Sequence, residues 1–509
     1  MRSPFLARLH ALASSDRLAV SDDLVRRSFA ELHDRALRAR SALCDGRASL
    51  EGRRVAILVS PSVAWVEAFL GVVLGGGVAL PLSPLYPPGE LAWFGDDAGA
   101  DTLIVSADLA ARAGDLAQNR RVLPVETIAD GPREESTSIE AIAADDTALL
   151  LYTSGTTGKP KGAMLTHENL AVQAALLREA WGFCEDDRLL HALPLHHLHG
   201  LGISLLTTLL AGSASRLLPR FEAARVWNEL AEKRATTFMA VPTMYQKLFE
   251  AFDAADEPTR ARWAEGARAL RLATSGSAAL PVTLAARWKD LTGAIPLERF
   301  GMTEIGVGMS NPRDPSARRP GHVGPPLPSV ESRIVDDAGQ DSLTGPGEIY
   351  IRGPSVFKGY WNRPEATLAA FAEGWFKTGD IAERAADGAI RLLGRTSIDI
   401  LKSGGYKLSA LEIEEALREN PAVAEVAVIG LPDEVWGDRV VAVIVPSSIP
   451  GAAAACATEA IRAWARDRLA SYKIPRETVL VAALPRNPLG KVVKPELIQS
   501  LRAPRPQPT

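Results

Sequence analysis

One stretch of the chain combines residue types that can hold a polyphosphate. Residues 152–162 read Tyr-Thr-Ser-Gly-Thr-Thr-Gly-Lys-Pro-Lys-Gly. Glycines let backbone N–H groups close around an anion, hydroxyl groups add donors, and lysines add positive charge. The string lacks the Gly-x-x-x-x-Gly-Lys-Ser/Thr order of a Walker loop, and a flexible surface loop is the alternative interpretation. The candidate phosphate-binding residues are Thr153, Ser154, Gly155, Thr156, Thr157, Gly158, Lys159 and Lys161.

This string resembles the phosphate-binding signature of the adenylate-forming superfamily, which contains acyl-CoA synthetases, luciferases and adenylation domains. Other strings resemble the same superfamily in the expected order, so the resemblance covers nearly the whole sequence. It implies that a carboxylate is first joined to the α-phosphate of ATP and that the acyl group is then transferred to a thiol. Both partners of the first step are anions, so the site must neutralise and align them. The implied cofactors are ATP, Mg²⁺ and coenzyme A, the last as a co-substrate.

The segment 298–304, Glu-Arg-Phe-Gly-Met-Thr-Glu, resembles the superfamily's aromatic-Gly-x-Thr-Glu motif. By that resemblance, Thr303 hydrogen-bonds the α-phosphate and Phe300 lies against adenine. Glu304 would bind Mg²⁺, which prefers hard carboxylate oxygens and bridges phosphate oxygens. The alternative is a strand-end turn with solvated charges. The same resemblance adds four residues to the ATP site: Gly276, Ser277, Glu298 and Gly301.

Three charged residues nearer the carboxyl terminus complete the expected ATP site. Asp380, in the string Trp-Phe-Lys-Thr-Gly-Asp, would accept both ribose hydroxyls, because a carboxylate has two acceptor oxygens. Arg395 would place a cation near the ribose and phosphate. Lys491, in Pro-Arg-Asn-Pro-Leu-Gly-Lys, resembles the superfamily's catalytic lysine and would bridge the attacking carboxylate and the α-phosphate. Outside this setting, each residue would be an ordinary surface charge.

A domain boundary is predicted directly after Arg395. The expected organisation is a large ATP- and acid-binding domain over 1–395, a hinge over 396–400, and a small domain over 401–509 that carries Lys491. The resemblance places a hinge and a thiol-binding face here, and Asp399 is the candidate pivot. The residues expected to contact CoA or the thioester are Ser403, Gly404, Gly405, Tyr406 and Lys407.

Clustered histidines follow Leu193-Pro-Leu195. They include His196, His197 and His199, with His191 nearby. A metal site is disfavoured, because no cysteine or carboxylate joins them at ligand spacing. A structural role in a packed loop is one alternative. The resemblance places the acyl pocket here, and His197 fits the position that gates the thiol channel, so we count it among the catalytic candidates.

Arg299 bears on the identity of the acid. A buried arginine without a partner is costly, and a second substrate carboxylate would satisfy it in a bidentate fork. The alternative is an ion pair with Glu298 or another acid. The strings 196–200, 238–245, 274–281, 302–306 with 310–312, and 395–399 together look like malonyl-CoA synthetases. By that resemblance, Arg299, Ser277 and His199 recognise the distal carboxylate. One departure is Ser329, where relatives usually carry glycine.

The expected activity is therefore ATP-dependent ligation of malonate, or a small substituted malonate, to CoA with release of pyrophosphate and AMP. One alternative is an acyl-adenylating ligase for another small or aromatic acid, or one that loads a carrier protein in trans. A degenerate member that binds ligands without turnover is another. Such a member would lack Lys491, Glu304 or Thr303, and all three are present.

Alternating strands and helices must position these residues. The alternation predicts parallel sheets covered on both faces, and the phosphate loop is expected to lead from a strand into a helix capped by Thr166. The expected fold is α/β: a large domain of two parallel-type α/β subdomains and a small β-barrel-like piece, then a small mobile α+β domain. The main predicted strands are 53–59, 78–81, 101–105, 236–241, 270–274 and 348–352, and the main helices are 62–74 and 89–98.

Length and composition limit the remaining possibilities. A chain of 509 residues requires at least two domains, and a net charge of −4 argues against a nucleic-acid partner. Its three cysteines share no metal-ligand spacing, and the lack of a cysteine-rich framework favours a reducing compartment. The longest apolar helical run, near 201–211, is too short to span a bilayer. We expect a cytoplasmic monomer or homodimer, with an organellar matrix as the alternative location.

Overall fold

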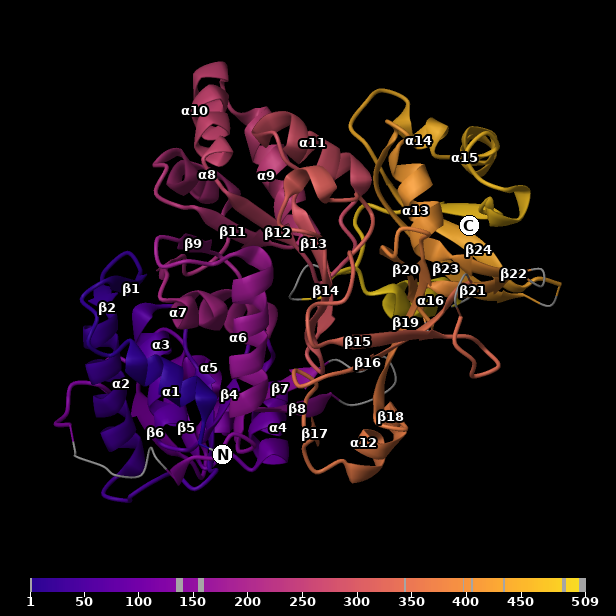
Figure 1. The fold of residues 1–509 in the computed structure, drawn as a ribbon. Helices are drawn as coiled ribbons and strands as arrows, with labels where there is room; N and C mark the ends of the chain where they lie inside the picture. The colour runs from indigo at the N-terminus through magenta and orange to yellow at the C-terminus, as the bar shows by residue number, and fades with distance from the viewer. Residues whose placement is uncertain are drawn as a thin grey trace.

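The computed structural model describes residues 2–133, 141–153, 160–342, 345–396, 398–403, 406–433, 435–487 and 491–502. The predictions for Ser154, Gly155, Thr156, Thr157, Gly158, Lys159, Gly404 and Gly405 fall outside these residues, as does the side chain of Lys407. The secondary structure follows the α/β alternation expected from the sequence, and the order of its elements along the chain can be followed in Figure 1.

The first sheet has the strand order β17-β8-β7-β4-β3-β5-β6. Strands β3, β4 and β5 pair in parallel and consist mainly of Val, Ile, Leu and Ala, because helices bury both faces of a parallel sheet. The strands are β3 (Arg54–Leu58), β4 (Val78–Pro81), β5 (Thr102–Val105), β6 (Arg121–Pro124), β7 (Thr147–Thr153), β8 (Lys161–Thr166) and β17 (Gly359–Tyr360). The helices of this region are α1 (Pro4–Ala11), α2 (Phe29–Cys44), α3 (Val63–Leu74), α4 (Pro88–Ala98) and α5 (Ala110–Ala113), with a 3₁₀ turn at Gly114–Ala117.

The candidate phosphate loop connects two antiparallel strands, so the prediction that it leads directly into a helix was wrong. Tyr152 pairs with Gly162, and Thr153 pairs with Lys161. The segment β8 has few β-branched residues and gave no strand signal, but it pairs with both β7 and β17. The predicted cap is confirmed at the end of β8, where Thr166 forms a capping box at the start of α6 (His167–Trp181).

The second sheet has the order β14-β13-β12-β11-β9-β10-β1-β2 and is parallel from β13 to β1. Figure 1 shows α8 to α11 along one side of it. Its strands are β1 (Leu18–Ser21), β2 (Arg26–Ser28), β9 (Arg188–His191), β10 (Ala214–Leu217), β11 (Thr237–Ala240), β12 (Leu272–Ser275), β13 (Leu297–Met302) and β14 (Gly306–Ser310). Its helices are α7 (Thr207–Ala211), α8 (Ala223–Ala231), α9 (Pro242–Ala254), α10 (Glu257–Arg268) and α11 (Val282–Thr292).

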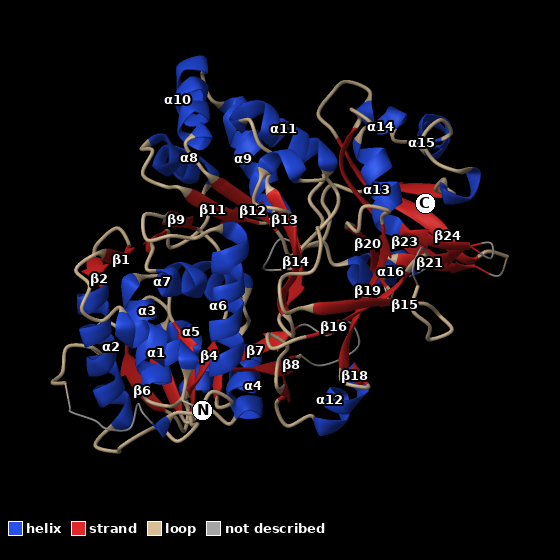
Figure 2. Ribbon diagram, viewed as in Figure 1, coloured by secondary structure: helices blue, strands red, loops and turns tan. Residues whose placement is uncertain are grey.

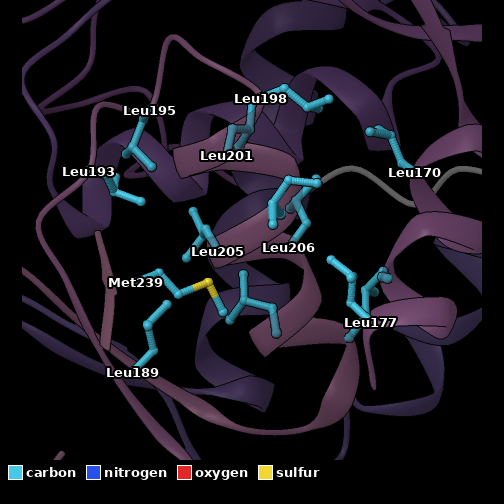
Figure 3. Packing of buried hydrophobic residues seen from close by; sticks show 14 of the residues in the cluster. Leu170, Leu177, Leu189, Leu193, Leu195, Leu198, Leu201, Leu205, Leu206 and Met239 are labelled. Carbon is cyan, nitrogen blue, oxygen red and sulfur yellow. The ribbon is translucent and has the colours of Figure 1, made fainter. Parts of the chain in front are cut away.

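A leucine-rich core lies between this sheet and α6. A π-helix, His199–Leu206, runs into α7, and its leucines pack against α6 and β9 (Figure 3). Leu177 and Leu205 are fully buried, and Leu189 is nearly so. Burying each such side chain contributes roughly 1.5–3 kcal/mol. The core therefore fixes the start of the π-helix, and with it His199, against the end of the second sheet.

The third sheet is antiparallel, with the order β15-β16-β19-β18 and β20 paired to β19. It forms the small curled piece that the sequence predicted, but it begins at Glu331, earlier than expected. Its elements are β15 (Glu331–Val335), β16 (Gly347–Arg352), β18 (Phe371–Ala372), β19 (Trp375–Arg384), β20 (Ile390–Arg395) and α12 (Pro364–Ala370), preceded by a 3₁₀ turn at Pro315–Ala317.

The carboxyl-terminal elements form an α+β unit beside the second and third sheets (Figure 2). Ser409 caps α13 by accepting a hydrogen bond from the Glu412 N–H. The strands are β21 (Ile400–Ser403), β22 (Tyr406–Ser409), β23 (Val423–Asp433), β24 (Gly437–Pro446) and β25 (Glu477–Leu480). The helices are α13 (Ala410–Arg418), α14 (Ala452–Ala455), α15 (Thr458–Ala465) and α16 (Lys494–Arg502), with a 3₁₀ turn at Ser471–Lys473.

The predicted fold class is confirmed by two parallel-type sheets, the small antiparallel sheet and the carboxyl-terminal α+β unit. Within the ranges that the structure describes, no helix combines the length and apolar character needed to cross a bilayer.

Candidate active site

Arg299 lies on β13 and is the least satisfied charge of the described structure. Its residue exposure is 6%, and its Nε and Nη2 atoms have no hydrogen-bond partner among the described residues. Burial lowers the pKa of Arg299 to about 10, so the guanidinium remains charged at neutral pH. The adjacent Glu298 does not pair with it; its Oε1 instead accepts a 2.9 Å hydrogen bond from the Gly321 N–H. The ion-pair alternative for Arg299 therefore finds no partner in the described chain.

Gly276, Ser277 and His199 surround the guanidinium. A Cβ at Gly276 would overlap with Cζ and Nε of Arg299, so only glycine leaves room for the arginine here. Ser277 adopts φ 69°, and its Oγ lies 3.1 Å from Nδ1 of His199. Burial, and then the charge of Arg299, hold the pKa of His199 well below its ordinary value. The imidazole is therefore neutral, and its buried Nε2 has no hydrogen-bond partner in the part of the chain that the structure describes.

Two further histidines, His191 and His197, lie close enough to His199 to affect its pKa. Burial lowers the pKa of His197 to about 4, and its ring centroid lies 4.4 Å from that of His196. His191, at the end of β9, is buried, and this burial lowers its pKa to about 4, so its imidazole is also neutral. Sequence reasoning gave His191 no role, because a histidine at a strand end carries no local signal. These rings can donate or accept hydrogen bonds without carrying charge.

Glu304 lies at the β13–β14 turn, and the structure adds Tyr360 to it. The Tyr360 hydroxyl donates a 2.8 Å hydrogen bond to Glu304 Oε1, and the Lys161 ammonium lies 5.2 Å from the Tyr360 ring centroid. Burial raises the pKa of Glu304, while Tyr360 and the nearby cations oppose the shift. Tyr360 comes from the two-residue strand β17, which pairs with β8. The sequence offered no signal for this contact, since 56 residues separate the two partners.

The remaining predicted residues of the large domain lie around the same turn. Thr303 follows β13 and is half-buried, and Phe300 is buried on β13 with 7% exposure. Gly301 pairs with Val307 of β14 at a register shift. Two described residues of the candidate phosphate loop, Thr153 and Lys161, pair with each other across β7 and β8.

Asp380, Arg395 and Lys491 gather where the third sheet meets the small domain. Arg395 Nε lies 3.1 Å from Asp380 Oδ1, and the two residues are paired across β19 and β20. Burial raises the pKa of Asp380 to about 6, and the positive charges of Arg395 and Lys491 limit the rise. The Lys491 side chain keeps solvent contact. Partial desolvation and then the charge of Arg395 lower its pKa, whereas Asp399 and Asp380 act in the opposite direction.

The described part of the predicted thiol-binding face lies on the β21–β22 hairpin. Ser403 is buried and pairs with Tyr406 across the hairpin. Tyr406 is 54% exposed and stacks on Tyr472, with ring centroids 4.4 Å apart. The structure therefore brings Glu304 near Arg395 and Lys161, and Asp380 near Arg395 and Lys491. Arg299, Ser277 and His199 form a second group that begins on the same strand as the Glu304 turn.

Comparison with known proteins identifies the family to which the chain belongs. Residues 8–361 match the family described as AMP-binding enzyme, and residues 412–491 match the AMP-binding enzyme C-terminal domain. The mitochondrial malonate–CoA ligase of Bos taurus is 40% identical over 97% of this chain and 90% of its own length. ATP-bound MatB from Rhodopseudomonas palustris is 35% identical, covers 99% of each chain and gives a TM-score of 0.89; its apo structure, with the same identity and coverage, gives 0.80. The chain belongs to the AMP-binding enzyme family.

Proposed function

We propose that this chain is an ATP-dependent malonate–CoA ligase, which forms malonyl-adenylate and pyrophosphate and then malonyl-CoA and AMP. The observation that carries the proposal is the buried Arg299 guanidinium, which lacks a described protein partner and lies beside Ser277 and His199. A dicarboxylate leaves one carboxylate free to react and offers the second to this group. The relatives named malonate–CoA ligase support the same substrate.

The adenylation step needs an aligned carboxylate and a neutralised phosphate. We assign Asp380 to binding the ribose hydroxyls. Arg395 and Lys491 would lie on the α-phosphate side. Thr303 and the candidate phosphate loop would bind the phosphate oxygens. Lys491 would approach the attacking carboxylate from the small domain. Its nearness to Asp380 and Arg395 supports this role, as does the closer superposition on the ATP-bound relative than on its apo form.

Glu304 is our candidate ligand for Mg²⁺. Its carboxylate is buried, and a hydroxyl rather than a cation occupies its Oε1, so a positive charge would favour the ionised form. A bound Mg²⁺ would neutralise phosphate charge. Tyr360 keeps the carboxylate oriented, and Lys161 adds a second cation on the same side.

Thioester formation requires the small domain to present another face. We propose a large domain over 1–395, a hinge over 396–400 with Asp399 as pivot, and a small domain over 401–509. Separate hydrophobic clusters support the boundary: one ends at Ile390, and another begins at Leu401. On rotation, Ser403 and Tyr406 would approach the CoA thiol, with His197 at the channel.

The decisive assay measures CoA-thioester formation across malonate, methylmalonate, succinate, acetate and benzoate. We expect malonate to give the highest kcat/KM, with CoA as acceptor. Preference for benzoate or acetate, or transfer only to a carrier protein, would favour the alternative ligase. No pyrophosphate release with any acid would favour a binding protein without turnover.

Compartment and assembly remain predictions. The Bos taurus relative is named as mitochondrial, which supports the organellar alternative over a cytoplasmic location. Fractionation of the source cells would decide between them, and sedimentation would distinguish a monomer from a homodimer.

A further inference from the structure

A buried lysine three residues after Lys491 has no part in the proposed chemistry. Lys494 is the first residue of α16, and its side chain is 8% exposed. Its Nζ lies 2.6 Å from Asp399 Oδ1 and 2.7 Å from Glu414 Oε1. Burial opposes its charge, but Glu414 and Asp399 outweigh that effect and raise the pKa of Lys494. It is therefore a fully charged ammonium held between two carboxylates.

The two carboxylates belong to different parts of the chain. Glu414 is on α13 of the small domain, where it also accepts a hydrogen bond from the Val428 N–H and pairs with Arg418. It would therefore stay with Lys494 if the small domain moved as a unit. Asp399 lies in the linker, so its pair with Lys494 joins the linker to α16.

Asp399 is also hydrogen-bonded to the large domain, through Arg395 at the end of β20. Its Oδ2 accepts a 3.1 Å hydrogen bond from the Arg395 N–H, and its own N–H donates to the Arg395 carbonyl. Gly394, on the same strand, has φ 123°, and a Cβ there would overlap with that of Asp399. The Asp399 carboxylate thus connects the end of β20 with Lys494. A rotation about this residue would have to change one of these two connections.

We propose that Lys494 is a positioning residue: by pairing with Asp399 it fastens the linker and holds Lys491 beside Asp380 and Arg395 for adenylation. The inference rests on the proposed two-step function. The pair stabilises the present domain arrangement and loosens when the small domain rotates toward the thiol. Lys494 itself touches no reacting group.

The main test separates the two half-reactions. Lys494→Met keeps the side-chain volume but removes the charge. It should lower malonate-dependent ATP–pyrophosphate exchange at least tenfold, while thioester formation from supplied malonyl-adenylate and CoA changes less than twofold. Lys494→Arg keeps the charge and should retain exchange within about threefold. Glu414→Gln, the matched control inside the small domain, should leave the ratio of the two rates unchanged. Equal losses in both half-reactions, or the same split in Glu414→Gln, would overturn the proposal.

A double-mutant cycle adds a pairwise test that does not depend on one variant. Asp399→Asn leaves the pair of Lys494 with Glu414 in place, so folding is retained even if Lys494→Met fails to fold. Asp399→Asn should also lower exchange selectively. Where all variants fold, the double variant should be no slower than the slower single variant, because one contact is lost only once. If the losses of exchange in the two single variants multiply in the double variant, the two residues act independently. An Asp399→Asn variant without a selective loss of exchange would contradict the proposed role of the Lys494–Asp399 pair.

A distance measurement separates this inference from the proposed substrate. Fluorophores on the exposed Cys184 and on a cysteine introduced by Ala463→Cys report the distance between the large and small domains without any substrate. Lys494→Met should broaden or shift the distance distribution, and Lys494→Arg should restore it. An unchanged distance distribution in Lys494→Met would refute the proposal that the Lys494–Asp399 pair stabilises the domain arrangement. If the wild-type chain shows no malonate-dependent exchange, the proposed function fails, while this readout still tests Lys494.

Discussion

Ser277 Oγ lies 3.1 Å from His199 Nδ1, and this contact joins segments 78 residues apart in the sequence. Ser277 reaches it from a left-handed backbone conformation that costs a non-glycine residue roughly 1–2 kcal/mol. Such strain persists where the surrounding structure maintains it. Here it places a hydroxyl and a neutral imidazole beside the guanidinium of Arg299. The group provides donors and one positive charge, as a carboxylate requires.

Gly276 tests the packing of this group. Gly276→Ala should displace the Arg299 guanidinium, because the new methyl group would overlap with Cζ and Nε. We expect kcat/KM for malonate to fall about tenfold to a hundredfold, as a small misplacement of a binding group does. Steady-state kinetics would measure it. Gly89→Ala, where a Cβ meets no atom within 4 Å, is the control and should behave as wild type. Unchanged malonate kinetics in Gly276→Ala would mean that Arg299 does not hold the acid.

Lys491 is expected to serve adenylation. Lys491→Ala should abolish malonate-dependent pyrophosphate release, because a charge that offsets two anions is lost. Turnover of supplied malonyl-adenylate with CoA should remain within a few-fold, since we propose that this step uses another face of the small domain. The two half-reactions are measured separately. Equal loss in both would remove Lys491 from its assigned role.

The hinge prediction makes the opposite split. Ile398→Pro removes an N–H that donates to the Arg395 carbonyl and fixes φ next to the proposed pivot, while it leaves the Asp399 carboxylate in its pair with Lys494. Thioester formation should fall further than adenylation, because rotation is needed only for the second step. Stopped-flow measurement of both steps would show it. Loss of adenylation with normal thioester formation would place the pivot elsewhere in the linker.

Asp380 should give ATP binding a pH dependence. Burial raises its pKa to about 6, and the carboxylate must be ionised to accept two ribose hydroxyls. As pH falls through about 6, protonation removes an acceptor, so kcat/KM for ATP should decline below that pH and level off above it. Asp380→Asn should be weaker throughout and lose this inflection. A wild-type profile that stays flat from pH 7 down to pH 5 would contradict the assignment.

The sequence predicted the chemistry of this molecule better than its local connections. Strings such as 298–304 keep their residue types together, so candidate roles could be assigned without coordinates. The strand β8 was missed because its residues favour a strand only through pairing with β7 and β17. Tyr360 was missed for a related reason: it meets Glu304 through sheet topology rather than through sequence spacing.

Ser329 shows where a departure from related sequences has a physical meaning. It is exposed and adopts φ 62°, a conformation that glycine takes without strain. Ser329→Gly should therefore raise the free energy of unfolding by about 0.5–1 kcal/mol, once the added freedom of the unfolded chain is subtracted. Ser332→Gly, on the neighbouring β15, should instead destabilise. Urea unfolding of the two variants would compare them, and a loss of stability in Ser329→Gly would show that the turn needs the serine side chain.

Arg299 is the residue on which the substrate assignment depends. A site built for a charged group rejects an analogue that lacks it, because the buried charge of the protein is left unpaired. Removing one partner of a buried pair costs on the order of 3–5 kcal/mol, or roughly a hundredfold to several-thousandfold in rate. An apolar pocket distinguishes one methylene by only about 1–3 kcal/mol. Arg299→Ala should therefore lower kcat/KM for malonate by the larger factor.

The same variant should narrow or reverse the preference for malonate over acetate or butyrate. ATP affinity should change little, because Thr303, Asp380 and Arg395 remain. Arg299→Lys should rescue partially at best, since it keeps the charge but loses the bidentate fork. Competition between malonate and butyrate in one assay measures the preference directly. If Arg299→Ala retains the malonate preference, the guanidinium has a structural role, and the distal carboxylate must be recognised by other residues.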